Sequence, residues 1–338
     1  MSTQPEGRRP TIRTVADRAG VSKSLVSLVI RNSPNVSPER RAAVQVAMDE
    51  LGYRPNASAR ALAEDRTRLI AVLVNDLRNP WYIHALEGIN ALLHRRDLRM
   101  MIGDQRLDLL GDEVLTAAFL EMDVDGLVIT GSMVQSERLI HTATHLPTVV
   151  VGSRSLALPR GDLVCNDDEQ GSRLAVDHLV GHGHRSIAFL NAPTDAAIFR
   201  EQGYRDTIAG HGLETFVDMD DPSEDGGYRA TVRLLTANPR LTAIFAYNDL
   251  MALGALSAAE QLGLDVPGDL SIVGYDDTTM AQLKAISLTT VDNASYRIGY
   301  RAADLLVDRI AAPSRPPQTL LLEPQLVVRR TTGPAPTD

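Results

Sequence analysis

The chain has 338 residues, of which 44% are hydrophobic and 23% are charged, a composition typical of globular proteins at a length that suits about two domains. No apolar run reaches the roughly 18 residues that a membrane span requires, and the first ten residues contain no apolar segment of the kind found in a secretory signal. Cys165 is the only cysteine, which excludes an intrachain disulfide and a cysteine-based metal site. We therefore expect a cytoplasmic protein that contacts no membrane.

The net charge of -9 is unevenly distributed along the chain. Residues 1–66 contain 11 Lys and Arg against 7 Asp and Glu, whereas the remainder contains 23 against 36. A small basic segment joined to a large acidic one suggests that only the basic segment contacts a polyanion such as nucleic acid. A basic surface that is merely solvated explains the same charges, so charge alone leaves both interpretations open.

The basic segment is predicted to contain helices and no strands. A short first helix ends at Gly20, and Ser22 is a suitable N-cap for a second. The sequence "SPE" at 37–39 combines a capping serine, a proline at the first helical position and an acid in the first turn, which predicts a third helix that ends at Gly52. A fourth, short and Ala-rich helix is predicted over 57–66.

From Leu69 onward, short β-type runs alternate with amphipathic helical segments. The predicted strands are 69–74, 98–103, 126–130, 148–152, 162–166, 186–192, 243–247 and 270–276. Most are separated by 10–17 residues at helical period, which favours parallel sheets covered by helices on both faces. Either one large sheet or two similar lobes satisfies this pattern. The tail "TTGPAPTD" is predicted to be disordered.

The second helix of the basic segment has two distinct faces. Ser22, Val26, Val29 and Ile30 form one stripe, and Ser24, Ser27, Leu28 and Arg31 form the other. A helix, the turn "AGVS" and a second helix match the spacing of a helix-turn-helix, and small residues on the outer face allow close approach to another molecule. An ordinary three-helix mini-domain remains the alternative from the pattern alone.

More specific motifs then follow in a fixed order. "T-I-x-x-V-A-x-x-A-G-V-S", "N-x-S-x-x-V-S" and "L-G-Y-x-P-N" resemble the headpiece of the lactose/galactose-repressor (LacI/GalR) family of bacterial transcription regulators. "TAIFAYNDLMALGAL" and "GLDVPGDLSIVGYDD" resemble the ligand-binding domain of that family, and the resemblance covers residues 11–332. It implies an all-α helix-turn-helix headpiece and an α/β periplasmic-binding-protein-like core of two parallel-sheet lobes.

The resemblance also implies how the chain is divided. A headpiece over 10–55 precedes a hinge helix and linker over 56–66, a core over 67–332 and a tail over 333–338. Within the core, the N-terminal lobe is expected over about 67–162 and 293–320. The C-terminal lobe is expected over about 163–292 and 321–332, so the chain crosses between lobes three times.

Ten positions are implied to contact DNA. Lys23, Ser24 and Leu28 fall where the family reads bases in the major groove, and Ser22, Ser27, Arg31 and Ser37 fall near phosphate contacts. The hinge adds Asn56 as its cap, Ala59, and Leu62, which matches the leucine that wedges into the minor groove. Leu28 and Leu25 depart from the family, because a hydrogen-bonding residue is common at the first position and Thr at the second. Leu28 cannot donate a hydrogen bond but can pack on a thymine methyl group.

The implied effector site lies at the C-terminal ends of the core strands, where clefts of such folds form. Seven residues there are expected to contact the effector: Asp76, Trp81, Tyr82, Arg154, Arg200, Asn248 and Asp276. Carboxylates, amides and guanidinium groups pair with neighbouring hydroxyls, and an aromatic ring covers the apolar face of a sugar. Two alternatives remain, since Trp81 and Tyr82 also suit lobe-core packing and Asp76 suits capping of the helix near Pro80.

One departure bears on the ligand class. Pro222 falls about where the family often has an aromatic stacking residue, which disfavours purines and leaves sugars open. We therefore expect a ligand-responsive repressor of carbohydrate-use genes that acts as a homodimer on double-stranded operator DNA, with a sugar or sugar derivative as effector.

Competing functions find less support in the sequence. A transport binding protein explains the cleft but not the helix-turn-helix, and an α/β enzyme explains the core, yet no catalytic motif is present. The acidic loop from Asp218 lacks the glycine and final glutamate of a calcium loop. His141 and His145 share a helix face but have no third ligand. We expect no catalysis, no cofactor and no metal.

Overall fold

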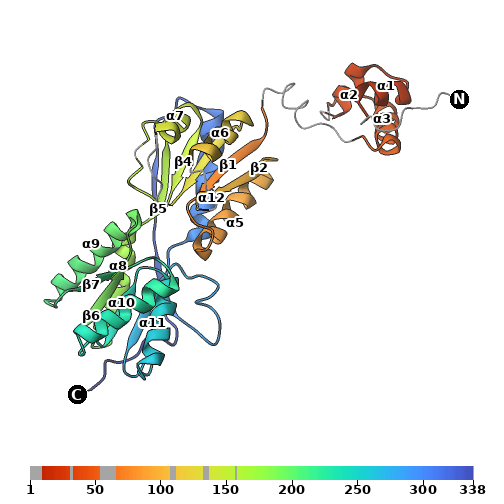
Figure 1. Cartoon of the computed structure of the whole chain (residues 1–338). Coiled ribbons are helices and arrows are strands. Elements are labelled where there is room, and N and C mark those ends of the chain that lie inside the picture. The colour runs from red at the N-terminus through yellow and green to blue at the C-terminus, as the bar shows by residue number, and fades with distance from the viewer. Residues whose placement is uncertain are drawn as a thin grey trace. The chain divides into compact units, whose positions relative to one another are not determined.

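The computed structural model describes residues 10–30, 33–53, 66–106, 112–131, 137–156 and 158–337. Contacts divide the chain into a headpiece, residues 1–68, and a core, residues 69–338 (Figure 1). Among the described residues, no helix combines the length and the hydrophobicity that a membrane span needs.

Three of the four predicted helices lie in the described part of the headpiece: α1 (Ile12–Ala19), α2 (Lys23–Ile30) and α3 (Pro38–Leu51). The fourth was predicted over 57–66, of which 57–65 lie outside the described residues. Gly20 ends α1 in the left-handed conformation, with φ 67°, which a glycine adopts without steric cost. The side chain of Ser37 accepts a hydrogen bond from the backbone N–H of Arg40, and Pro38 follows it in the first turn of α3. These signals therefore begin and end the helices where the sequence predicts.

The three helices enclose a small apolar core. Val15 and Ala16 of α1 and Val26 and Val29 of α2 are buried together with Val44 of α3. The apolar residues of the predicted inner stripe of α2 therefore pack with α1, whereas Ser24 of the other stripe is exposed.

The first lobe of the core is a parallel sheet of six strands in the order β11-β5-β4-β3-β1-β2. These strands are β1 (Leu69–Val74), β2 (Arg99–Asp104), β3 (Gly126–Thr130), β4 (Thr148–Val151), β5 (Asp162–Asn166) and β11 (Thr319–Leu322). Its helices are α5 (Pro80–Arg95), α6 (Asp112–Glu121), α7 (Glu137–His145) and α12 (Ser295–Ala311). Apolar side chains of α5 and α12 pack with one face of the sheet.

The second lobe repeats this arrangement in the order β12-β10-β9-β8-β6-β7. Its strands are β6 (Ile187–Asn191), β7 (Phe216–Met219), β8 (Ala243–Ala246), β9 (Ser271–Tyr275), β10 (Thr289–Asp292) and β12 (Gln325–Val327). Only β12 among these described strands runs antiparallel, beside β10. The helices are α8 (Asp168–Gly181), α9 (Asp195–Gly210), α10 (Glu224–Ala237) and α11 (Asp249–Gln261).

The chain crosses between the lobes after β5, after β10 and after β11, so the core has two lobes rather than one large sheet. Two predicted lobe boundaries are wrong by a few residues. The whole of β5 through Asn166 and the whole of β11 through Leu322 pair within the first lobe. The boundaries therefore fall at the ends of these strands, because a strand stays with its ladder partner over its full length.

The prediction of a disordered tail is also wrong for the residues that the structure describes. The backbone N–H of Gly333 donates to Ser271 Oγ at 3.1 Å, and the Ala335 N–H donates to the carbonyl of His182 at 2.9 Å. Polar groups of the second lobe thus hold a segment whose composition resembles a linker.

Candidate functional sites

The outer face of α2 carries the residues predicted to read DNA. Ser22, Lys23 and Ser24 are exposed at the start of the helix, and Ser27 is half-buried. Ser22 Oγ also accepts a hydrogen bond from the Leu25 N–H at 3.2 Å, so this serine caps α2 as predicted. Ser37 is likewise exposed and caps α3.

The two residues of α2 that depart from the family pattern are partly buried in the headpiece. Leu25 and Leu28 are half-buried and pack against the apolar core of the three helices. Leu28 therefore presents only part of its side chain to the outer face. Four further predicted DNA contacts, Arg31, Asn56, Ala59 and Leu62, lie outside the described residues.

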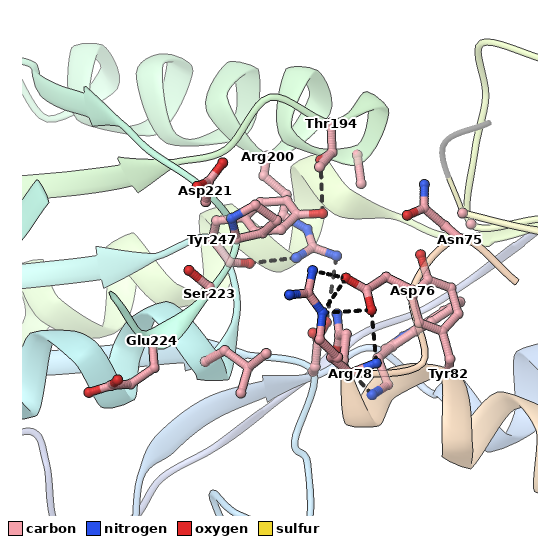
Figure 2. A pocket seen from close by; sticks show the side chains of 18 of the residues that line it. Asn75, Asp76, Arg78, Tyr82, Thr194, Arg200, Asp221, Ser223, Glu224 and Tyr247 are labelled. Carbon is pink, nitrogen blue, oxygen red and sulfur yellow. Dashed lines mark hydrogen bonds and ion pairs between the residues drawn. The ribbon is translucent and has the colours of Figure 1, made fainter. Parts of the chain in front are cut away.

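The predicted effector cleft lies between the two lobes of the core and encloses a cavity of about 520 Å³, within the range of small-molecule sites. Five of the seven predicted effector residues line it: Asp76, Trp81, Tyr82, Arg200 and Asp276. They come from both lobes, and Figure 2 shows Asp76 and Tyr82 facing Arg200 and Tyr247 across the cavity. The strand ends therefore converge as the sequence predicts.

Asp76 on the first lobe is held by two arginines. Its carboxylate lies 2.5 Å from Arg78 Nη2 and 3.0 Å from Arg106 Nε. Partial burial works against ionisation, but hydrogen bonds from Arg78 prevail and lower the pKa of Asp76. The alternative role of Asp76 as a helix cap is wrong, because Asn79 caps α5.

Trp81 and Tyr82 form an aromatic pair on the first turn of α5. Their ring centres are 5.1 Å apart in an edge-to-face arrangement. Trp81 is 7% exposed and belongs to the apolar core of its lobe while it also lines the cleft. A Cβ at Gly152, which has φ 70°, would lie 3.1 Å from the Trp81 ring. A glycine at this strand end therefore makes room for the tryptophan.

Arg200 lies at the base of the cleft and is almost fully buried. Its Nε donates to Asp168 at 2.9 Å, and its Nη1 donates to the Tyr247 carbonyl at 2.5 Å. The guanidinium carbon is 3.7 Å from the centre of the Tyr275 ring and 4.6 Å from that of Tyr247. Burial opposes the charge of Arg200, but Asp168 and its other neighbours raise its pKa, so the guanidinium stays charged.

A chain of hydrogen bonds beneath the cavity joins the two lobes. Trp81 Nε1 donates to Asn293 Oδ1 at 3.0 Å, and Asn293 Nδ2 donates to Asp276 Oδ1 at 2.8 Å. Asp276 lies 3.7 Å from Arg200 Nη2. Asn293 follows β10 in a crossover, so these hydrogen bonds join the cavity base to a segment that connects the lobes.

Asp276 is the least accessible carboxyl group of the cleft. Burial raises its pKa well above the usual range, although Arg200 acts in the opposite direction. Its backbone has φ 110°, a conformation that is uncommon for residues other than glycine and costs least for Asn and Asp. This geometry turns the side chain at the end of β9 into the cavity base.

Two predicted effector residues do not line the cavity. Asn248 is buried, and its Oδ1 accepts from the Met251 N–H at 2.8 Å to cap α11, while its Nδ2 donates to the Pro222 carbonyl at 3.2 Å. Its neighbour Tyr247 lines the cleft instead. Arg154 stacks on Phe199, 4.1 Å from the ring centre. The side chain of Asn248 thus serves as a helix cap, and that of Arg154 is engaged in packing.

Further lining residues were not predicted from the sequence as effector contacts: Asn75, Arg78, Asn166, Thr194, Asp221, Ser223, Glu224 and Tyr247. Most follow a strand directly or begin a helix, which is a signal that the sequence does carry. Pro222 also lines the cleft. The family resemblance implies an aromatic stacking residue at about this position, which this chain lacks.

The geometry of the cleft suits the binding of a polar small molecule. Carboxyl, amide and guanidinium groups beside an aromatic pair provide hydrogen bonds and an apolar face for a polyhydroxylated molecule. Joined to a helix-turn-helix in one chain, such a cleft defines the class of DNA-binding transcription regulators that respond to a small molecule.

Comparison with known proteins gives the family. Residues 11–56 match the bacterial regulatory proteins of the lacI family, and residues 176–332 match the periplasmic binding protein-like domain. The transcriptional regulator CelR of Thermobifida fusca is 35% identical, over 96% of this chain and 98% of CelR. GalR of Escherichia coli K12 is 32% identical over 96% of each chain. The chain therefore belongs to the LacI family of transcriptional regulators.

Solved structures agree with this assignment. The lac repressor dimer bound to operator and the anti-inducer ONPF is similar with a TM-score of 0.85 at 28% identity, over 96% of this chain and 100% of that one. A CelR–cellobiose complex gives a TM-score of 0.73 at 33% identity, with the same coverage. These relatives are named as regulators, a class of proteins that are not enzymes.

Proposed function

We propose that this chain is a repressor of carbohydrate-use genes that binds operator DNA as a homodimer and responds to a sugar in the interlobe cleft. The observation that carries the proposal is the composition of the cleft. Hydrogen-bonding side chains from both lobes lie beside Trp81 and Tyr82, an arrangement that suits a sugar. The likeness to a CelR–cellobiose complex supports the same ligand class.

In this proposal the headpiece over 10–55 docks α2 in the major groove. Lys23 and Ser24, both exposed, contact base edges, while serines at the helix starts contact phosphates. The hinge over 56–66 contributes Leu62 as a minor-groove wedge. Two copies of the chain place two headpieces on a pseudo-palindromic operator.

The sugar acts by binding two states of the core unequally. It contacts both lobes, so it favours one relative arrangement of them, and the chain from Trp81 through Asn293 to Asp276 carries that preference into a crossover. Operator affinity changes only as far as the ligand distinguishes the two states.

Gel-shift titrations test this function. The full chain should bind DNA from upstream of its own gene about a thousandfold more tightly than unrelated DNA of equal length. A sugar that raises the melting temperature in a thermal-shift screen should change this affinity about 5- to 150-fold. Equal affinity for the two DNAs would overturn the operator role, and consumption of the sugar would favour an enzyme.

A further inference from the structure

The charged groups of the cleft are predominantly acidic. Among the described residues, its lining includes the carboxyl groups of Asp76, Asp221, Glu224 and Asp276 and the guanidinium groups of Arg78 and Arg200. Figure 2 shows Asp221 and Glu224 on one side of the cavity and the paired Asp76 and Arg78 on the other. Even with Asp276 protonated, three carboxylates face two cations.

Both guanidinium groups are already bound to carboxylates of the protein. Arg78 Nε lies 3.0 Å and 2.9 Å from the two oxygens of Asp76. Arg200 is paired with Asp168 at 2.9 Å and lies 3.7 Å from Asp276. The charge of each guanidinium group is therefore already balanced by a carboxylate of the protein, which weakens its attraction for a phosphate or carboxylate on the ligand.

Helix N-termini at the cleft do not compensate for this shortage of positive charge. α5, α9 and α10 all begin at the cavity, and backbone N–H groups at helix starts ordinarily favour anions. Here the side chains of Asn79, Thr194 and Ser223 each accept a hydrogen bond from one of these N–H groups. In addition, α9 and α10 carry acidic residues in their first turns, and these carboxylates occupy the favourable position themselves.

We infer that the effector is a carbohydrate without phosphate or carboxylate groups, and that the cleft rejects the phosphorylated or oxidised form of the same sugar. This inference rests on the proposed carbohydrate effector. The carboxylates repel a ligand anion, and the charges of both arginines are already balanced by carboxylates of the protein. Hydroxyl groups meet no such penalty, since carboxylates and amides accept their hydrogen bonds.

Matched ligand pairs test the inference by calorimetry on the full chain. The probes are glucose with glucose 6-phosphate and gluconate, trehalose with trehalose 6-phosphate, and cellobiose, lactose and maltose with their aldonic acids. For any pair that binds, we expect the neutral member to bind at least about tenfold more tightly. An anionic member that binds as tightly as its neutral partner overturns the inference alone. Binding by no member contradicts the carbohydrate effector as well.

A charge-removal variant identifies the source of the discrimination. In the double variant Asp221→Asn/Glu224→Gln, the ratio of the two dissociation constants should shrink about fivefold, chiefly through tighter binding of the anion. Asp225→Asn is the matched control, because Asp225 is an exposed acid in the same turn of α10 that does not line the cavity. Equal ratios in the double variant and the wild type would overturn the assignment to these two groups.

Ionic strength provides a second readout. Repulsion between exposed charges is screened by salt, so the preference for the neutral sugar should narrow as salt rises while affinity for the neutral sugar itself stays constant. A preference that does not change with salt would overturn an electrostatic origin.

Discussion

Asp276 combines an unusual backbone conformation with a side chain that lines the cavity. It accepts from Asn293 Nδ2 at 2.8 Å and adopts φ 110°. Asp276→Asn keeps both features, because Asn also tolerates positive φ and retains an oxygen acceptor. The variant side chain has one oxygen instead of two, so it can accept fewer hydrogen bonds from sugar hydroxyl groups. We expect effector affinity to fall about tenfold, equivalent to about 1.4 kcal/mol, as measured by calorimetry.

Operator binding without ligand is the control for Asp276→Asn. Its dissociation constant should stay within about twofold of the wild type, a difference of about 0.4 kcal/mol. Lost operator affinity with an intact sugar response would remove Asp276 from the effector site. The isosteric change is preferable to Arg200→Ala, which would leave buried Asp168 without its partner and destabilise the core.

His178 links the stability of the second lobe to pH. Burial, with the nearby His182 and His184, lowers the pKa of His178 from 6.5 to about 4. The unfolded chain therefore binds this proton first, and the contribution of His178 to folding is lost as pH falls from about 6.5 toward about 4. His178 also hydrogen-bonds Thr332 at 2.9 Å, a contact that a glutamine can retain.

His178→Gln should remove this pH dependence. As pH falls from about 7 to about 4, the free energy of unfolding of the variant should rise relative to that of the wild type by about 1–2 kcal/mol, a relative gain in stability, after allowance for solvent screening. Urea titrations of both proteins at each pH measure this difference. Burial raises the pKa of Asp249 to about 6, which has the opposite effect on stability, but this contribution is the same in both proteins and cancels in the comparison. Parallel pH profiles would contradict the assignment.

At the residue scale, the sequence predicts where the cleft lies better than which side chain faces it. The strand end near 247 is correctly placed, but Asn248 caps α11 and Tyr247 lines the cavity. A single residue of offset decides this, because neighbouring side chains at a strand end point in different directions. Arg154 stacks on Phe199 instead of lining the cavity. This contact joins segments that are distant in sequence, so no local pattern reveals it.

The segment after β4 forms a contact between the lobes outside the cavity. Ser153 Oγ donates to Asp195 Oδ2 at 2.6 Å, and Ser155 Oγ donates to the same oxygen. Arg154 stacks on Phe199, one turn further along α9. Three consecutive residues of the first lobe thus hold one face of a second-lobe helix.

This contact should bias the core toward the arrangement seen here. Asp195→Ala removes the acceptor, and Ser153→Ala/Ser155→Ala removes the donors. Each should weaken apparent sugar affinity about three- to tenfold, because less of the protein is in the binding-competent state. Calorimetry on both variants and on their combination measures the effect.

The control for these variants is Asp206→Ala, an exposed change on the same helix. If the serine and aspartate variants act through one contact, their combination should be no weaker than either alone. Fully additive losses would show that the two sides act separately.

We expect helix α2 to carry the operator preference. Leu28 is half-buried on the headpiece core, and an arginine there can keep its aliphatic stem on that core while its guanidinium reaches the groove. Leu28→Arg should shift the preferred operator toward guanine at one symmetric position. Selection from a randomised operator library checks this, and an unchanged consensus would mean that Leu28 does not face the bases.

At the element scale, strongly patterned strands and capped helices are predictable and weakly patterned ones are not. Every strand predicted from the sequence is present within one residue. β7, β10, β11 and β12 were missed. β7, β10 and β12 lack the run of three or more apolar residues that marks the equally short β4 and β8. The prediction of a disordered tail was wrong because the tail forms hydrogen bonds with His182 and Ser271, which are distant in sequence.

At the scale of the whole molecule, the central claim is that the cleft and the headpiece are energetically coupled. Such coupling is reciprocal: the factor by which a sugar changes operator affinity must equal the factor by which operator changes sugar affinity. The lobes are connected by three crossovers, after β5, β10 and β11, and we expect the coupling to act through them.

The most direct test measures sugar affinity by calorimetry with and without saturating operator DNA. We expect the two dissociation constants to differ about 5- to 150-fold, and to match the change in operator affinity that saturating sugar causes in a gel shift. Equal sugar affinity on and off the operator, with the sugar bound in the cleft, would contradict the account.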